Sequence, residues 1–138
     1  MKAADQLEKE GMHCCVIDPF TIKPLDEATI VKHAQRTGGT VLTVEDHYPA
    51  GGIGVAVAAC VAKHGIRVKS LCVNDVPRSG KPDELLDMFG ISARRMLKLS
   101  KNTEHFFRPA DFEFKRILCR ILTLHTAELC RGFILAVT

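Results

Sequence analysis

The chain has 138 residues, of which 46% are hydrophobic and 25% charged, an ordinary balance for one globular domain that excludes disorder throughout. Nineteen basic and sixteen acidic residues leave a net charge of +3, which is too small and too mixed to indicate a nucleic-acid or membrane partner. No apolar run approaches the roughly 20 residues of a membrane-spanning helix. Residues 1–8 lack the apolar core of a secretory signal, so we expect none.

Six cysteines raise the question of a disulfide framework. Cys14, Cys60 and Cys72 lie inside apolar runs, and the chain holds no Cys-x-x-Cys pair and no spacing typical of zinc ligands. We therefore expect free, buried thiols in an intracellular protein, with Cys119 and Cys130 the most exposed and oxidisable. The following histidines show no ligand spacing to one another and are expected to have surface or packing roles: His13, His33, His64, His105 and His125.

The first half of the chain alternates helices with strands. Residues 2–10 predict a short helix that Gly11 stops, and residues 13–17 form a compact apolar strand. Asp26 is a good N-cap for a helix whose apolar positions repeat at helical spacing, and residues 40–44 predict the second strand.

The alternation continues beyond residue 50. Residues 51–54 open a helix that closes at Gly65, and residues 68–73 predict the third strand. Pro82 suits the first turn of the next helix, and Ser92 caps a further one. Farther on, residues 114–122 fit an amphipathic helix and residues 132–137 could form a strand.

Strands that alternate with helices across short Gly/Pro connections predict an α/β fold with a parallel sheet covered on both faces. Such sheets place their sites at the carboxyl ends of the strands. Those ends carry Asp18, the Glu45-Asp46-His47 run and the 74–80 loop.

Three ordered blocks are specific enough to indicate a family. They are residues 11–26 (GMHCCVIDPFTIKPLD), residues 43–48 with 51–54 (TVEDHY and GGIG), and residues 79–81 with 84–92 (SGK and ELLDMFGIS). Through them, residues 1–99 resemble the C-terminal domain of transketolase in its vertebrate form.

The resemblance implies a three-layer α/β/α domain with a mostly parallel sheet. Complete transketolases transfer a two-carbon ketol unit between sugar phosphates in the pentose phosphate pathway, with thiamine diphosphate and Mg or Ca. Their two earlier domains supply the cofactor, metal and catalytic groups, so this chain is expected to carry no such residues and to be non-catalytic alone. The C-terminal domain contributes structure and subunit contacts. The implied partner is a transketolase subunit or a second copy, in the cytoplasm.

Two departures from the family pattern divide the chain. Residues 1–99 lack the strand with which the family domain begins, and residues 100–138 match nothing in the family, so we interpret them as a divergent C-terminal extension. The missing strand would leave a neighbouring strand with an unpaired edge. One hypothesis is that residues 132–137 fill its place.

Two groups of residues are candidates for a polar or anion site. In the Glu45-Asp46-His47 run, an acid beside a histidine could perform acid–base chemistry, whereas the plainer interpretation is a polar strand end that satisfies loop backbone groups. Gly52 and Gly54 open a helix whose free N–H groups could bind phosphate, whereas the plainer interpretation is close packing of the helix start.

Arg78, Ser79 and Lys81 form a basic loop. Pro82 follows Lys81, and no glycine lies at the upstream position that a P-loop needs. We interpret this segment as a subunit-contact loop, or else as a plain solvated loop. The leading functional interpretation is thus a transketolase C-terminal contact domain. The alternatives are a stand-alone binding module for transketolase subunits and an independent domain that binds a phosphate-bearing small molecule near Gly52 and His47.

Overall fold

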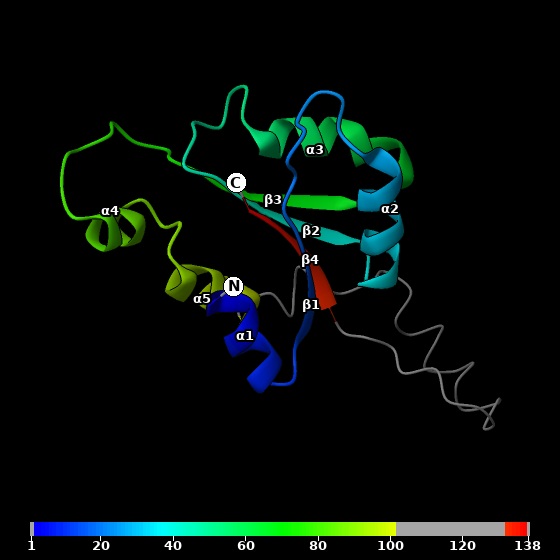
Figure 1. Ribbon diagram of the computed structural model, residues 1–138, viewed down its shortest axis with the longest axis horizontal. Helices are drawn as coiled ribbons and strands as arrows, with labels where there is room; N and C mark the ends of the chain where they lie inside the picture. Colours follow the sequence, from blue (N-terminus) through cyan, green and yellow to red (C-terminus); the bar gives the residue numbers. More distant parts are fainter. Residues whose placement is uncertain (1, 102–131, 138) are drawn as a thin grey trace.

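The computed structural model describes residues 2–101 and 132–137. They form a four-stranded, wholly parallel sheet in the order β1-β4-β2-β3 (Figure 1). The strands are β1 (His13–Ile17), β2 (Thr40–Val44), β3 (Arg67–Leu71) and β4 (Gly132–Val137). The helices are α1 (Lys2–Lys9), α2 (Glu27–Arg36), α3 (Ile53–Val61), the 3-10 turn η1 (Ala62–His64), α4 (Pro82–Met88) and α5 (Ala93–Lys101).

Two apolar cores cover the two faces of the sheet. All five residues of β2 are buried, and its three apolar residues are divided between these cores. Leu42 and Val44 pack with α1 and α5 around Leu7 and Met96, whereas Val41 packs with α2 and α3 around Val57. The helices therefore lie on both sides of the sheet (Figure 1), and the predicted three-layer α/β/α arrangement is confirmed.

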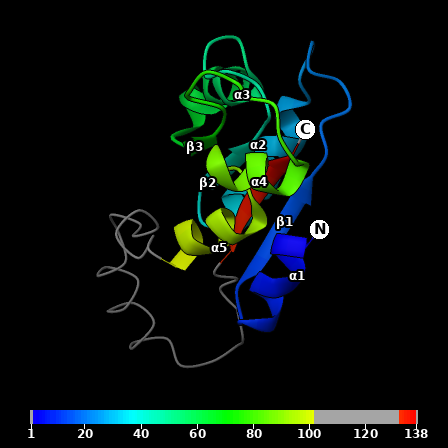
Figure 2. The same ribbon diagram turned by 90° about the vertical axis from the view of Figure 1, so that its left-hand side faces the viewer.

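Strand β4 lies between β1 and β2 (Figure 2). It runs parallel to both, with Cys14 opposite Phe133 and Leu42 opposite Leu135. Residues 132–137 therefore do form a strand of this sheet, as the hypothesis requires. That this strand takes the place of the family's first strand, and that the lack of the latter leaves an unpaired edge, stay predictions. Residues 132–137 thus belong to the same sheet as residues 13–71. The boundary proposed at residue 99 stays a prediction, and the helix predicted over 114–122 lies outside the described residues.

Local signals placed most elements correctly. Asp26 Oδ1 accepts from the Thr29 N–H over 3.0 Å, as its N-cap prediction requires. Pro82 begins α4, and the Ser92 hydroxyl accepts from the Arg95 N–H at the start of α5. The third strand differs from its prediction of 68–73, since it spans Arg67–Leu71. Its pairing nevertheless continues past the strand, because the Val73 N–H donates to the His47 carbonyl over 2.9 Å.

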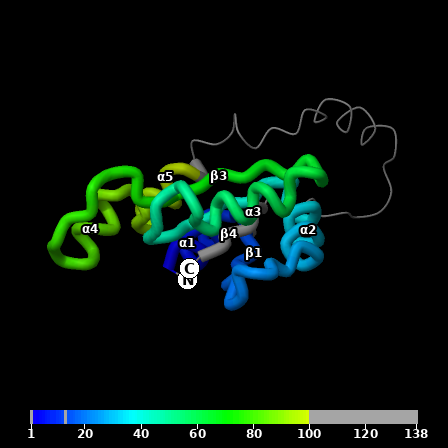
Figure 3. The backbone as a smooth tube through the Cα atoms, turned by 90° about the horizontal axis from the view of Figure 1, so that it is seen from above, coloured from blue at the N-terminus to red at the C-terminus, as the bar shows by residue number. Residues whose placement is uncertain are grey.

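The connection from β3 through α4 extends away from the sheet. Figure 3 shows α4 at the opposite end of the molecule from α2. Within residues 2–101 and 132–137, none of the helices combines the length and the apolar character needed to cross a membrane.

Candidate functional site

The carboxyl end of β2 holds a buried carboxylate. Glu45 directly follows the strand and is 3% exposed. Its Oε2 accepts from the Ile53 N–H over 2.6 Å and its Oε1 from the Gly54 N–H over 2.9 Å. Both donors lie in the first turn of α3, where N–H groups have no partner within the helix and where the helix dipole favours negative charge. The contacts support the plainer interpretation of Glu45, a strand end that satisfies backbone groups.

The glycines that open α3 are in close contact with the sheet. A Cβ atom on Gly52 would collide with the Glu45 carboxylate, and one on Gly54 would collide with the Ser70 hydroxyl. Ser70 in turn accepts from the Thr43 hydroxyl over 2.9 Å. This packing supports the interpretation of the glycines as a close-packed helix start. A phosphate at the Ile53 and Gly54 amides would have to displace a buried carboxylate.

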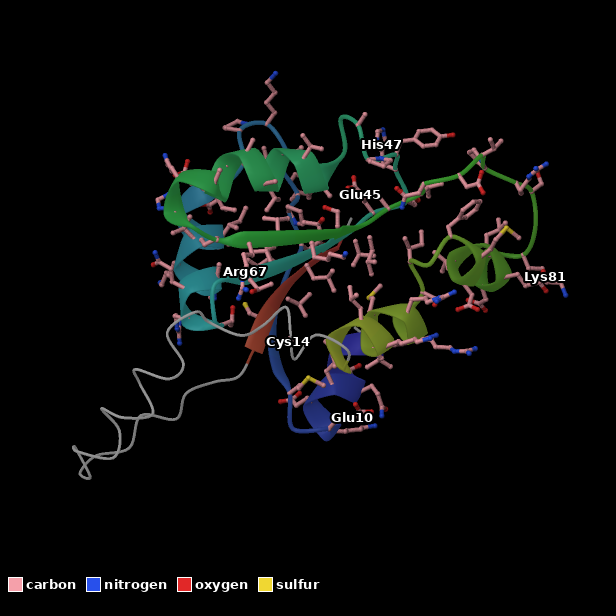
Figure 4. All side chains as sticks on the ribbon, turned by 180° about the vertical axis from the view of Figure 1, so that it is seen from behind. Glu10, Cys14, Glu45, His47, Arg67 and Lys81 are labelled. Carbon is pink, nitrogen blue, oxygen red and sulfur yellow. The ribbon has the colours of Figure 1, made fainter. Side chains whose placement is uncertain are left out.

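Asp46 and His47 directly follow Glu45 and are exposed. Figure 4 shows His47 near Glu45 at this strand end. The His47 Nδ1 donates to the Tyr48 carbonyl over 2.9 Å, and the two rings meet edge to face with centroids 6.2 Å apart. Within the described part of the chain, no hydrogen bond joins the His47 ring to Glu45 or Asp46. The structure thus brings the predicted acid and histidine to one strand end without pairing them.

The basic loop lies elsewhere. Arg78, Ser79 and Lys81 are exposed, and the Lys81 Nζ lies 3.8 Å from the Glu84 carboxylate one helical turn ahead. Figure 4 shows Lys81 well apart from Glu45 and His47. The two groups of predicted residues therefore form two separate surfaces, and the contact role of the loop stays a prediction.

Two contacts of histidines were not foreseen. The Cys15 thiol on β1 lies 3.3 Å from His33 Nδ1 on α2, and the Glu27 carboxylate accepts from both His64 Nε2 over 2.9 Å and Lys63 Nζ over 2.7 Å. Helical periodicity in the sequence indicates the contact between Cys15 and His33. His33 falls three residues after the buried Ile30, and that spacing places it on the sheet-facing side of α2.

The prediction of free thiols is confirmed for the four described cysteines. Cys72 is buried as expected, whereas the other three are only half-buried. Burial raises the pKa of the Cys14, Cys60 and Cys72 thiols, and the nearby Glu45 carboxylate raises that of Cys72 further. Cys119 and Cys130 lie outside the described residues.

The described residues do not fit thiamine diphosphate with its divalent cation. Within 2–101 and 132–137, no group of three or more His, Cys, Asp or Glu side chains could hold a metal ion. The amides that open α3, which could receive a diphosphate, already bind the Glu45 carboxylate.

The structure defines an α/β/α domain with a parallel sheet. At the carboxyl end of β2, the Glu45 carboxylate binds the first amides of α3. The chain belongs to the transketolase C-terminal domain family, because residues 1–96 match the family described as "Transketolase, C-terminal domain". The predicted resemblance is confirmed.

Individual relatives agree with this assignment. The chain is 56% identical to mouse transketolase-like protein 2 over 102 residues, which cover 73% of this chain and 16% of that protein. It is 59% identical to human transketolase over 92 residues, 66% of this chain and 15% of that one. A solved structure titled "Split gene transketolase, inactive beta4 tetramer" matches 78% of this chain and 35% of its own, with a TM-score of 0.69 and 35% identity. The chain thus spans 16% of the first of these relatives and 15% of the second.

Proposed function

We propose that this chain acts as the C-terminal assembly domain of a transketolase-like protein in the cytoplasm. It contacts the other transketolase domains, or a second subunit, and leaves thiamine diphosphate binding and ketol transfer to them. Its small share of the relatives' length supports this division of labour, since most of a transketolase lies outside the matched segment.

One observation carries the proposal. The Phe20 side chain, in the connection after β1, is 100% exposed. A fully exposed phenylalanine leaves a large apolar area in water, which contact with another surface would remove. Tyr48 follows β2 and is 48% exposed, and Val76 follows β3 and is 65% exposed. We call Phe20, Tyr48 and Val76 the carboxyl-end residues, because each follows the carboxyl end of a parallel strand.

The solved relative gives the proposal a precedent. Its title describes a transketolase divided between genes and an assembly into a tetramer. By analogy, the partner of this chain would be a transketolase polypeptide or a second copy. The basic Arg78–Lys81 loop, on its separate surface, would add a polar contact of the kind common at the border of an interface.

Complementation tests this function. The remaining part of mouse transketolase-like protein 2, without the segment that matches this chain, would be expressed alone and together with the full chain. Ketol transfer between sugar phosphates would be measured with thiamine diphosphate and Mg²⁺ present. We expect activity only in the mixture. Equal activity with and without the chain, or activity of the chain alone, would contradict the proposal.

The phosphate-binding alternative has less support. The Glu45 carboxylate already binds the amides that such a ligand would need. Binding of a sugar phosphate would raise the melting temperature of the chain, because only a ligand of the native state stabilises it.

A further inference from the structure

A thiol and an imidazole meet between β1 and α2. Cys15 Sγ and His33 Nδ1 lie 3.3 Å apart, and both residues are half-buried. Cys15 packs at the margin of the apolar core that surrounds Ile30 and Ala34 on α2. Because β1 is an outer strand of the sheet, the thiol stays partly accessible while the core fixes its position beside the ring.

This geometry allows a proton to pass from sulfur to nitrogen. An imidazole within hydrogen-bond reach of a thiol can accept its proton, and the thiolate that results is the nucleophilic form of cysteine. We propose that Cys15 is a thiol-modification site that reacts with small disulfides, with His33 as its base.

The reaction is a balanced thiol–disulfide exchange. His33 Nδ1 takes the proton of Cys15, and the thiolate attacks one sulfur of the disulfide. The S–S bond of the reagent breaks as the Cys15–S–S bond forms. The departing thiolate leaves with the electron pair and takes up the proton from His33. Cys15 is oxidised to a mixed disulfide, half of the reagent is reduced to a thiol, and the base is restored.

The other described thiols lack this arrangement. Cys14 is the chain neighbour of Cys15, but alternation along β1 places it against the opposite core, with Leu7 and Met96. Burial raises the pKa of Cys14, which disfavours its thiolate. Cys60 packs on the same core as Cys15, and Cys72 is buried beside Asn74. Among the cysteines of residues 2–101 and 132–137, only Cys15 lies within hydrogen-bond distance of an imidazole.

Two single variants of the full chain separate the adjacent thiols. Cys14→Ser leaves Cys15 as the only thiol of its tryptic peptide, and Cys15→Ser leaves Cys14. Each folded protein would be incubated with oxidised glutathione, quenched in acid, digested and analysed by mass spectrometry. We expect the peptide of the Cys14→Ser protein to be modified at least about tenfold faster, since a positioned base typically contributes more than that. Equal rates would overturn the proposal.

A second pair of variants tests the role of the ring. In the Cys14→Ser background, His33→Asn and His33→Gln keep a polar side chain on α2 but remove the base. Each is expected to slow Cys15 about tenfold while Cys60 in the same digest keeps its rate. Cys72 is buried in the folded chain, so an unmodified Cys72 shows that a sample is folded. If one of the two His33 variants unfolds, the rate measured on the other tests the role of the ring. An unchanged Cys15 rate in a folded His33 variant would overturn the proposal, as would an equal loss at Cys60.

Discussion

The Glu45 carboxylate at the end of β2 accepts a 2.6 Å hydrogen bond from the Ile53 amide at the start of α3. This bond joins a strand to the next helix across the loop that carries His47 and Tyr48. The carboxyl end of β2, whose sequence most resembles an active centre, is therefore a structural contact between the strand and helix α3. Its chemistry is that of a buried helix cap, and the exposed residues around it are free to contact other surfaces.

Removal of the Glu45 carboxylate should destabilise the domain. Glu45→Ala leaves two buried N–H donors without their acceptor and should lower the free energy of unfolding by about 3 kcal/mol. Glu45→Gln keeps one acceptor oxygen but turns an NH₂ group toward a donor, so about 2 kcal/mol is expected. Urea unfolding followed by circular dichroism measures both. The exposed neighbour variant Asp46→Asn is the control and should stay within about 0.5 kcal/mol. A Glu45→Gln protein as stable as the unchanged chain would contradict a stabilising role for the hydrogen bonds between Glu45 and α3.

A methyl group at Gly54 should also be costly. Gly54→Ala places a Cβ against the Ser70 hydroxyl, and the helix must shift away from the sheet to make room. We expect a loss of about 2 kcal/mol in unfolding free energy, typical of overpacking, although alanine favours helices. Val55→Ala, on the exposed side of the same turn, is the matched control and should change stability by about 0.5 kcal/mol or less. Equal effects of the two variants would show that Gly54 is not tightly packed.

The exposed cluster of Glu27, Lys63 and His64 should make a small, pH-dependent contribution to stability. Hydrogen bonds from Lys63, and then from His64, lower the pKa of Glu27 below its usual range. A carboxyl whose pKa is lowered by folding stabilises the fold above its unfolded pKa, about 4.3 for Glu, and loses that contribution as pH falls through the folded pKa. Glu27→Gln should therefore be slightly less stable than the unchanged chain at pH 7 and equal to it in strong acid.

Urea unfolding at a series of pH values measures the Glu27 effect. Glu84→Gln provides the comparison, since Glu84 is exposed and its oxygen lies 3.8 Å from Lys81, a separation at which little stabilisation is expected. A Glu27→Gln difference that persists unchanged in acid would show that the ion pair is not its cause.

The backbone amides of β4 should exchange slowly with solvent. β4 pairs with β1 on one side and β2 on the other, so the sheet must open before these amides meet water. Hydrogen exchange of the full chain, measured by mass spectrometry after peptic digestion, should show protection over 132–137 comparable with that of β2. Exchange over this segment within seconds would contradict its place in the sheet.

Local chemistry made much of the fold predictable. Three helix starts follow from the preferences of single residues, namely Asp26, Pro82 and Ser92. In the structure, a helix begins at each of these positions. The central position of β4 was accessible only as a hypothesis, because it depends on pairing between segments at opposite ends of the chain. Backbone propensity contains no information about which strand lies beside which.

The candidate site was harder to predict for a related reason. Glu45 and Gly52 were both identified as candidates, yet the sequence could not show that the carboxylate fills the helix start. Likewise, Cys15 and His33 became partners through the face of β1 and the face of α2 that happen to meet. Such contacts depend on how one element is rotated against another, and a single sequence constrains that rotation only through its apolar pattern.

Binding between the full chain and the remaining part of mouse transketolase-like protein 2 tests the assembly role most directly. Sedimentation velocity would compare the unchanged chain with Phe20→Ser and with Ala59→Ser, an apolar-to-serine change on the exposed side of α3. The assembly role predicts a complex that Phe20→Ser weakens at least about tenfold and Ala59→Ser leaves intact, since truncation of a buried aromatic anchor commonly costs that much. No complex with the unchanged chain, or equal binding by all three proteins, would contradict it.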